Sequence, residues 1–384
     1  MTPLSVALYD ERGPADGPVL VLGPSLGTTA RLWQPQLGAL ARTHRVIRYD
    51  YPGHGGVPSA PGPYTIGDLG RSVLALLDGL GVDRFSYAGV SVGGMVGMWL
   101  ASEVPERVER LALVCTSPLL GPPGKWHDRA AAVRTNGMEA IAETVAGWFT
   151  PGFAVRRPEV VAAYRGMLAD AEPEGYAGCC EAIAAMDLRD RLSSITAPTL
   201  VVAGADDHAT PPEDAEGIVE RVSGARLEVV PEAAHLANVE QPETLRRLLA
   251  AHLDAARRDD DRHRRGMAVR RDVLGATHVD DAVARTDAFT ADFQDLITRY
   301  AWGDLWSREE LDHKTRSLVT LALLAALGHD DEVAMHVRAA VRNGLGAEQI
   351  REALLHVAVY AGVPAANTAF RIAQRVLKET RDND

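Results

Sequence analysis

The sequence predicts two domains in succession, an α/β domain with a mostly parallel sheet followed by an all-α domain. From residue 18 to about 118, short apolar runs alternate with longer amphipathic stretches, which is typical of a parallel sheet covered by helices on both faces. After Gly266 this alternation stops, and apolar residues recur only at the helical spacings i, i+3, i+4 and i+7. The charged run RRDDDRHRRG, residues 257–266, separates the two patterns and has no apolar residue to face a core. A chain of 384 residues is long enough for two to three domains.

The expected strands are short apolar runs rich in β-branched and aliphatic residues. They lie at residues 18–23, 45–50, 84–91, 110–117, 197–207 and 225–235. Two amphipathic stretches, residues 65–81 and 93–108, have Gly or Pro near their ends and are expected to be helices over this sheet. Residues 119–193 interrupt the alternation with helical patterns and no strand, so we expect a helical lid over an active site.

Composition argues against several classes of function. The 40 Lys and Arg against 52 Asp and Glu give a net charge of −12, which argues against a nucleic-acid or anionic-membrane partner but allows small anionic substrates. No apolar run reaches the ~18 residues needed to cross a bilayer, and the first residues lack the basic-then-apolar order of a secretory signal. The three cysteines, Cys115, Cys179 and Cys180, form neither a disulfide framework nor a Cys-x-x-Cys pair. We therefore expect a cytoplasmic protein without a metal site.

A Gly-x-Ser-x-Gly motif at residues 89–93 lies between an expected strand and an expected helix. Small residues let the backbone turn sharply there, so the hydroxyl of Ser91 can project above the sheet, and the helix N-terminus favours developing negative charge. The alternative is an ordinary serine in a Gly-rich turn, since the chain has 35 glycines. The position of the motif after a strand and before a helix favours a nucleophile.

A serine nucleophile needs a histidine base and a carboxylate that orients it. Asp206 and Asp207 follow one expected strand, and His235 follows the next. The chain order Ser, acid, His resembles that of the α/β-hydrolases. Their acid loop, Gly-x-x-Asp-x-x-Thr/Val-Pro, matches here at Gly204, Asp207, Thr210 and Pro211. The resemblance therefore favours Asp207 as the acid and His235 as the base.

Two further stretches carry this resemblance. The turn YDYPGHGGVP matches the family's Asp-x-x-Gly-His-Gly pattern, which makes His54 a structural turn residue, whereas His44, His208 and His252 lack such context and are expected at the surface. The stretch SLGT…LW, after the first core strand, resembles the 3-oxoadipate enol-lactonases in particular. The resemblance implies an oxyanion hole made by the backbone N–H groups of Val92 and Leu26.

The lid is expected to contact the substrate. Its candidate lining residues are Lys125, Trp126, Arg129, Arg134 and Trp148. We select Arg134 to pair with a substrate carboxylate and Trp126 as a further contact. The alternative for each is a solvated helix face.

The second domain resembles the 4-carboxymuconolactone decarboxylases over nearly its whole length. The matching stretches are VLGATHVD (273–280), RYAWGDLWSR (299–308), KTRSLVTLALLAALG (314–328), EVAMHVRAAVRNG (332–344) and HVAVYAGVPAAN (356–367). The wider superfamily includes peroxide-reducing proteins that use Cys-x-x-Cys, but no cysteine follows Cys180. Thiol chemistry in this domain is therefore excluded. Helices this apolar also predict faces buried in a homo-oligomer.

The decarboxylase resemblance implies a reaction without a cofactor, because the substrate's lactone carbonyl accepts the electrons that CO2 leaves behind. Glu332 and His336 are spaced i, i+4 and share one helix face, so the carboxylate could orient the imidazole as an acid/base. The alternative is an ordinary exposed Glu–His pair. Arg316 is expected to bind a carboxylate and His356 to be a second polar contact. Three aromatic residues are expected in the core: Trp302, Trp306 and Tyr360.

Together the two resemblances imply a bifunctional enzyme of protocatechuate degradation, with residues 1–256 and 267–384 joined by the charged linker 257–266. The second domain would decarboxylate 4-carboxymuconolactone, and the first would hydrolyse the resulting enol-lactone to 3-oxoadipate. The alternative is a hydrolase of another ester or lactone that carries a non-catalytic helical oligomerisation domain.

Overall fold

The computed structural model describes residues 4–381, and of residues 255–260 and 381 it describes only the backbone. The chain divides into two compact units, Met1–Leu253 and Asp254–Asp384. Nowhere in residues 4–381 is a helix both long and apolar enough to cross a membrane.

The first unit is built on a seven-stranded sheet in the order β1-β3-β2-β4-β5-β6-β7. The strands are β1 (Ala7–Arg12), β2 (Val19–Gly23), β3 (Arg45–Asp50), β4 (Phe85–Val90), β5 (Val108–Val114), β6 (Thr199–Gly204) and β7 (Arg226–Val230). All six predicted strands are present and pair in parallel. The seventh strand, β1, was not predicted. It pairs antiparallel with β3 at the edge of the sheet, and most of its side chains are exposed.

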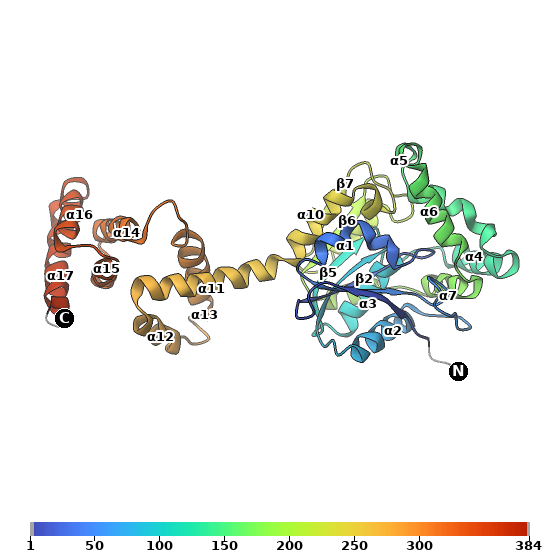
Figure 1. The fold of residues 1–384 in the computed structure, drawn as a ribbon, viewed down its shortest axis with the longest axis horizontal. Coiled ribbons are helices and arrows are strands. Elements are labelled where there is room, and N and C mark those ends of the chain that lie inside the picture. Colours follow the sequence, from blue (N-terminus) through green and yellow to red (C-terminus); the bar gives the residue numbers. More distant parts are fainter. Residues whose placement is uncertain (1–3, 382–384) are drawn as a thin grey trace. The chain divides into compact units, whose positions relative to one another are not determined.

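Helices cover both faces of this sheet, as predicted (Figure 1). On one face α2 packs on α3, and on the other α1 packs on α10. The helices outside the lid are α1 (Gln34–Leu40), α2 (Ile66–Gly79), α3 (Val92–Glu103), α8 (Pro212–Val219), α9 (Ala237–Glu240) and α10 (Pro242–Leu253), with a 3-10 turn η1 (Ala30–Trp33). Helix α2 begins with a capping box, in which Thr65 and Asp68 satisfy each other's backbone N–H groups.

A helical insertion between β5 and β6 forms the predicted lid. It contains α4 (Pro123–Asn136), η2 (Met138–Trp148), α5 (Pro151–Arg156), α6 (Pro158–Ala169), α7 (Pro173–Ala184) and η3 (Arg189–Ser194). Helix α4 packs along α7, and η2 packs on α6.

The second unit is helical throughout its described residues, as predicted. It contains α11 (Ala255–Leu274), α12 (Ala276–Ala284), α13 (Ala291–Ile297), the π-helix η4 (Thr298–Leu305), α14 (His313–Leu327), α15 (Asp330–Arg342), α16 (Ala347–Tyr360) and α17 (Val363–Arg381). One apolar cluster joins α14 to α17 around Leu321, Val337 and Leu354, and another surrounds Trp302 and Trp306. The two tryptophans are therefore core residues, as expected, with ring centroids 5.1 Å apart.

The charged run, expected to be a linker, is helical in the structure. Residues 257–266 belong to helix α11, where oppositely charged residues three apart, such as Asp261 and Arg264, pair on the helix surface. The end of the run packs against η4: the Arg265 guanidinium donates to the carbonyl of Gly303 at 2.9 Å. This part of the run therefore belongs to the second unit. The side chains of residues 257–260 lie outside those that the structure describes.

Candidate active sites

Ser91 lies at the turn between β4 and α3, with φ +56° and ψ −116°. This left-handed backbone costs a non-glycine residue roughly 1–3 kcal/mol and is found mainly at functional sites. Two hydrogen bonds hold the turn: the Ser91 N–H donates to the Val114 carbonyl at 2.9 Å, and the Ser91 carbonyl accepts from the Thr116 hydroxyl at 2.7 Å. The turn has the backbone geometry of a nucleophile elbow.

The glycines that flank Ser91 are required by close backbone contacts. A Cβ atom on Gly89 would lie 2.2 Å from the carbonyl carbon of Gly93, and one on Gly93 would lie 2.4 Å from the carbonyl oxygen of Gly23. Real Cβ atoms essentially never approach other atoms so closely. The motif therefore lets β4, α3 and the end of β2 meet at one point.

His235 and Asp207 form a buried pair. The Nδ1 atom of His235 lies 2.9 Å from Oδ2 of Asp207, and the same carboxylate accepts hydrogen bonds from the Thr210 hydroxyl and the N–H groups of Thr210 and Ala209. Burial raises the pKa of Asp207, but His235 and these donors lower it further, so the pKa lies below its usual value. Asp206 is exposed. The structure thus brings Asp207, the residue favoured by the sequence, next to the histidine.

Ser91 and His235 line one cavity of about 400 Å³, to which both the sheet-end loops and the lid contribute residues. No hydrogen bond joins the Ser91 hydroxyl to His235 among the described residues. Catalytic hydrogen bonds of this kind are often long or poorly aligned until substrate binds. The cavity is therefore the candidate site of the first unit.

Of the two predicted oxyanion donors, Leu26 lines this cavity, and Val92 directly follows the lining residue Ser91. Val92 is the first residue of α3, where backbone N–H groups have no partner within the helix. Leu26 lines the cavity, and among the described residues its N–H has no hydrogen-bond partner. The loop that carries Leu26 is held by His54, whose Nε2 accepts the N–H of Gly27 at 3.1 Å, and by Asp50, whose carboxylate accepts the N–H of Ala30 at 2.6 Å.

The lid places Arg129 rather than Arg134 at the cavity. Lys125, Trp126 and Arg129 line it, and the Arg129 guanidinium lies 4.9 Å from the centroid of the Trp126 ring. The guanidinium of Arg134 instead pairs with the carboxylates of Glu174 and Glu181 on α7. The selection of Arg134 as the substrate-binding arginine was therefore wrong, because its charge is already used to hold α4 against α7.

The expectation that three histidines lie at the surface was wrong for two of them. His44 and His252 are buried, and Nε2 of His252 lies 3.0 Å from the carbonyl oxygen of Leu111. His208 is exposed but lines the cavity.

In the second unit, His336 is buried on α15 while Glu332 is exposed one turn earlier. Burial lowers the pKa of His336 to about 4, although the negative charge of Glu332 acts in the opposite direction and raises this pKa. Among the described residues, Nδ1 of His336 has no hydrogen-bond partner, so the expected contact between the imidazole and the Glu332 carboxylate is absent. The imidazole is a buried, neutral group whose Nδ1 has no partner among the described residues.

Arg316 already uses part of its guanidinium within the chain. It is buried, its Nε donates to the carbonyl of Leu311, and its terminal NH2 donates to that of Arg308, each at 3.1 Å. Arg316 therefore holds the segment before α14. His356 is exposed, and its ring stacks on that of Tyr360. Tyr360 was expected in the core, but its side chain is 85% exposed, so this expectation was wrong.

Arg270, a buried arginine of α11, was not predicted as a site residue. Its guanidinium lies 3.0 Å from the side-chain oxygen of Gln294 and 3.3 Å from the hydroxyl of Thr298, which opens the π-helix η4. Its Nε has no partner among the described residues, and burial lowers its pKa. A buried cation with neutral partners is unusual, and π-helices often mark functional sites.

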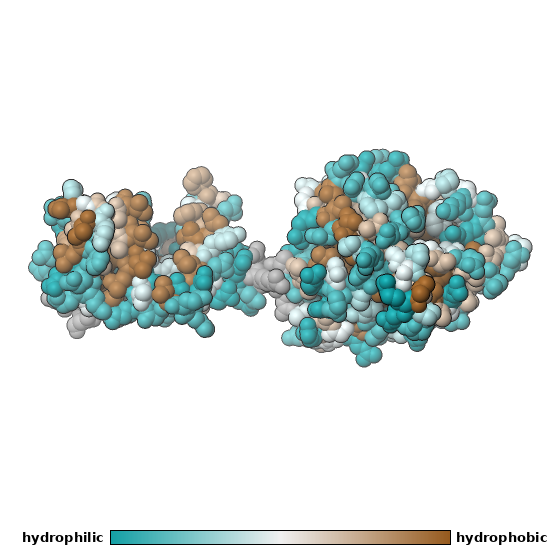
Figure 2. Space-filling model, turned by 90° about the horizontal axis from the view of Figure 1, so that it is seen from above, coloured by the Kyte–Doolittle hydropathy of each residue, from teal (hydrophilic) through white to brown (hydrophobic). Residues whose placement is uncertain are grey.

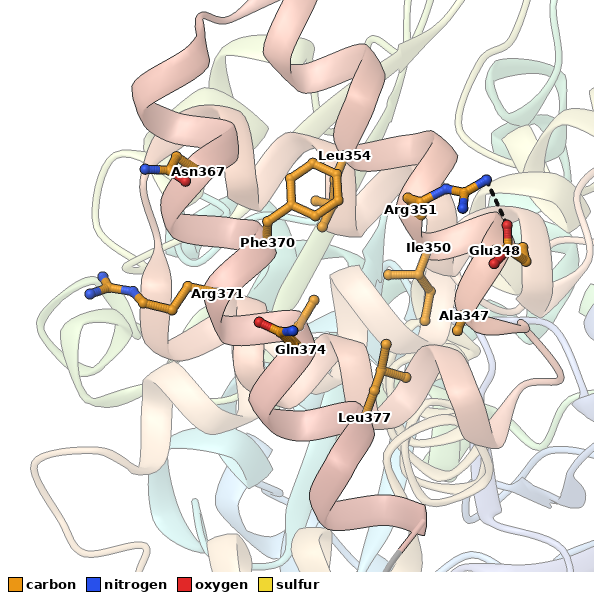
Figure 3. A pocket seen from close by; sticks show the side chains of 11 residues that line it. Ala347, Glu348, Ile350, Arg351, Leu354, Asn367, Phe370, Arg371, Gln374 and Leu377 are labelled. Atoms are coloured by element: carbon orange, nitrogen blue, oxygen red, sulfur yellow. Dashed lines mark ion pairs between the residues drawn. The ribbon is translucent and has the colours of Figure 1, made fainter.

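A second cavity, of about 410 Å³, lies between α16 and α17. Figure 3 shows Phe370 and Leu354 in its middle, the ion pair of Arg351 with Glu348 at one side and Arg371 at the other. Neither of the two predicted acid/base residues of the second unit lines this cavity.

Comparison with known proteins assigns each unit to a family. Residues 18–242 match the alpha/beta hydrolase fold, and residues 291–375 match the carboxymuconolactone decarboxylase family. The 3-oxoadipate enol-lactonase 2 of Acinetobacter baylyi is 42% identical over 253 residues, 65% of this chain and 94% of that relative. The 4-carboxymuconolactone decarboxylase of the same organism is 46% identical over 121 residues, 32% of this chain and 90% of that relative.

The solved enol-lactonase from Burkholderia xenovorans LB400 has a TM-score of 0.63 and 37% identity, and the similarity covers 65% of this chain and 96% of that one. The chain therefore belongs to the α/β-hydrolase family through its first unit and to the carboxymuconolactone decarboxylase family through its second, as a fusion of the two.

Proposed function

We propose that this chain performs two consecutive reactions of protocatechuate degradation. Its second unit decarboxylates 4-carboxymuconolactone to 3-oxoadipate enol-lactone, and its first unit hydrolyses that lactone to 3-oxoadipate. The observation that carries the proposal is that the two halves are similar to two different enzymes, and that the product of one reaction is the substrate of the other. We assign the lactonase activity to the unit Met1–Leu253 and the decarboxylase activity to the unit Asp254–Asp384, whose first helix α11 contains the charged run. Neither reaction requires a cofactor.

In the lactonase reaction, His235 removes the proton of the Ser91 hydroxyl, and the oxygen attacks the lactone carbonyl. The backbone N–H groups of Leu26 and Val92 bind the negative oxygen that forms. The ring C–O bond then breaks, and the enolate that leaves becomes a ketone when it gains a proton on carbon. Water, activated by His235, releases the acid and restores Ser91, while Asp207 keeps the imidazole in the required tautomer.

The cavity's charges support an anionic lactone as the substrate. Lys125 and Arg129 line it, and no Asp or Glu is among its described lining residues, although the chain carries a net charge of −12. A guanidinium can form two parallel hydrogen bonds with a carboxylate, and Trp126 restricts its orientation. We therefore assign the carboxylate of the enol-lactone to Arg129, with Lys125 as a second cation.

In the decarboxylase reaction, the bond between the ring carbon and the carboxylate breaks, and its electrons move through the adjacent double bond into the lactone carbonyl. The dienolate that forms must then gain a proton on carbon. We assign this proton transfer to His336, with Glu332 on the same helix face as the residue that exchanges protons with water. Arg270 replaces Arg316 as the group that binds a substrate carboxylate, because a buried guanidinium without a counter-charge gains most from an anion.

The surface of the second unit supports a homo-oligomer. Large apolar side chains are exposed along α14 and α16, at i, i+4 and i+8 spacing, and apolar surface is visible on this unit in Figure 2. They are Val319, Leu323 and Leu327 on α14, with Leu355, Val359 and Val363 on or next to α16. Patches of this extent on a single protein usually mark an interface, and a second copy presents a matching apolar face.

The test supplies the purified full chain with 4-carboxymuconolactone and follows both CO2 release and ring opening. We expect both, with Ser91→Ala abolishing ring opening only. His336→Ala should abolish both with this substrate, because no enol-lactone forms, and should still open enol-lactone that is supplied directly. If the unmutated chain opens the enol-lactone but releases no CO2, the second unit is an oligomerisation module. If it does neither and still hydrolyses other esters, the alternative hydrolase function holds.

A further inference from the structure

The loop between β2 and η1 carries one predicted oxyanion donor and is held by a separate turn of the chain. The end of β3 and the turn that follows it provide two acceptors: Nε2 of His54 accepts the N–H of Gly27 at 3.1 Å, and the carboxylate of Asp50 accepts the N–H of Ala30 at 2.6 Å. Gly27 directly follows Leu26 in the chain. The imidazole therefore fixes the peptide next to the one that carries the proposed oxyanion donor.

We propose that His54 is a positioning residue of the lactonase, which aligns the oxyanion loop through its hydrogen bond to Gly27. This inference rests on the proposed function of Ser91 and extends it from the cavity into the turn that supports it. His54 does not line the cavity, and it acts on the reaction through the backbone of Gly27 and Leu26.

The hydrogen bonds of His54 require one particular tautomer of a neutral ring. Its Nδ1 lies 3.0 Å from the carbonyl oxygen of Pro52, which can only accept, so Nδ1 carries the hydrogen. Nε2 is then unprotonated and accepts the N–H of Gly27. A protonated ring would turn a second N–H toward that of Gly27 and break the contact.

The surroundings of His54 favour this neutral form. The ring is 1% exposed and packs against the rings of Tyr51 and Tyr176. Burial lowers its pKa to about 4, although the carbonyl of Pro52 and the charge of Glu172 raise it. The ring therefore remains an acceptor at the pH values at which a Ser–His pair works.

Other hydrogen bonds also hold the loop, from Thr28 to the Ser25 carbonyl and from Ala30 to Asp50, but His54 provides the acceptor that the structure gives to the N–H of Gly27. Gly27 has φ +72°, and a Cβ atom there would lie 2.5 Å from Cδ1 of the lid residue Leu168 and 3.2 Å from the ring of Tyr176. The lid thus covers Gly27, and water cannot easily replace a lost acceptor. An N–H left buried without a partner is costly, so the loop would shift to relieve it, and the N–H of Leu26 would shift with it.

The test compares His54→Phe, which keeps the ring volume, with His54→Gln, whose side-chain oxygen can replace Nε2 as an acceptor. Because displacement of about 1 Å or loss of one oxyanion donor lowers rates on the order of 100-fold, we expect His54→Phe to lower kcat for the enol-lactone by 10- to 100-fold. KM should change less than threefold, and His54→Gln should recover most of the loss. Affinity for a phosphonate that mimics the tetrahedral intermediate should fall in parallel with kcat.

The matched control is His252→Phe, since His252 is equally buried, bonds to a backbone carbonyl and lies away from the loop. It should lower the melting temperature like His54→Phe and leave kcat unchanged. CO2 release by the same chain reports whether the second unit remains intact.

The proposal is wrong if folded His54→Phe keeps the wild-type kcat while Ser91→Ala is inactive, or if His252→Phe loses as much kcat as His54→Phe. If Ser91→Ala still opens the lactone, the proposed function fails instead, and His54 is not the cause.

Discussion

Two arginines of helix α4 provide the sharpest test of the lactonase cavity, because changing each one to glutamine should have a different effect. Arg129 lines the cavity, and Arg134 pairs with two lid carboxylates. Hydrogen bonds to a charged group contribute about 1.5–3 kcal/mol, so Arg129→Gln should raise KM for the enol-lactone roughly 10- to 150-fold. The carboxylate is remote from the reacting carbonyl and is bound equally before and in the transition state, so kcat should change little.

Arg134→Gln should leave KM unchanged and lower the thermal stability of the first unit. Its side chain is 33% exposed, and those of Glu174 and Glu181 are 38% and 16% exposed, so water screens both ion pairs. Pairs of this kind contribute about 0.2–1 kcal/mol each, which corresponds to a decrease of a few degrees at most in the melting temperature.

Steady-state kinetics of ring opening, measured beside hydrolysis of a neutral aryl acetate, separates binding of the carboxylate from damage to the site. Arg129→Gln should affect the lactone and spare the neutral ester. An equal loss on both substrates, or an increase in KM with Arg134→Gln instead, would refute the assignment of the carboxylate to Arg129.

Three further predictions concern the elbow, the second unit and its surface. Gly93→Ala places a Cβ 2.4 Å from the Gly23 carbonyl oxygen and should destabilise the first unit by about 1–3 kcal/mol while abolishing ring opening; an active, equally stable variant would contradict the contact. The pKa of His336 is about 4 in the folded protein and about 6.5 in the unfolded chain, so below pH 6.5 the unfolded state binds more protons than the folded state. Stability of the second unit should therefore fall on the order of 3 kcal/mol from pH 7 to 4, and His336→Phe should weaken this dependence in denaturant titrations. Leu323→Glu should lower the oligomer mass in sedimentation experiments, and an unchanged mass would place the interface elsewhere.

The parallel strands could be predicted from the sequence because both faces of the sheet are buried. Runs such as residues 199–204 are then uninterrupted aliphatic segments that need no alternation to be recognised. Strand β1 lacks this signal, since it lies at the edge and most of its side chains meet water. Ser91, Asp207 and His235 follow from chain order and short motifs, because such motifs directly follow strands that end at one edge of the sheet.

The lid and the second unit show where this reasoning stops. Arg129 and Arg134 are five residues apart, so they point about 140° apart around α4, and periodicity cannot say which faces the cavity. Exposed lid helices carry charges on every side. Likewise, i, i+4 spacing correctly placed Glu332 and His336 on one face, but the depth of each side chain depends on helices far away in sequence. Arg270 was missed for the same reason, since its partners come from α13 and η4.

The contrast between net charge and local charge explains how an acidic chain could act on anionic lactones. A net charge of −12 opposes the approach of an anion, but screening at physiological salt limits that repulsion to about 8 Å. Inside a cavity the nearest charges dominate, and those lining the lactonase cavity are Lys125 and Arg129, without a carboxylate beside them. In the second unit the same requirement falls on Arg270, which is buried and without a counter-charge among the described residues. In the proposed mechanism, two different folds would thus meet one chemical demand, a carboxylate removed from water, by keeping a guanidinium free of acidic partners.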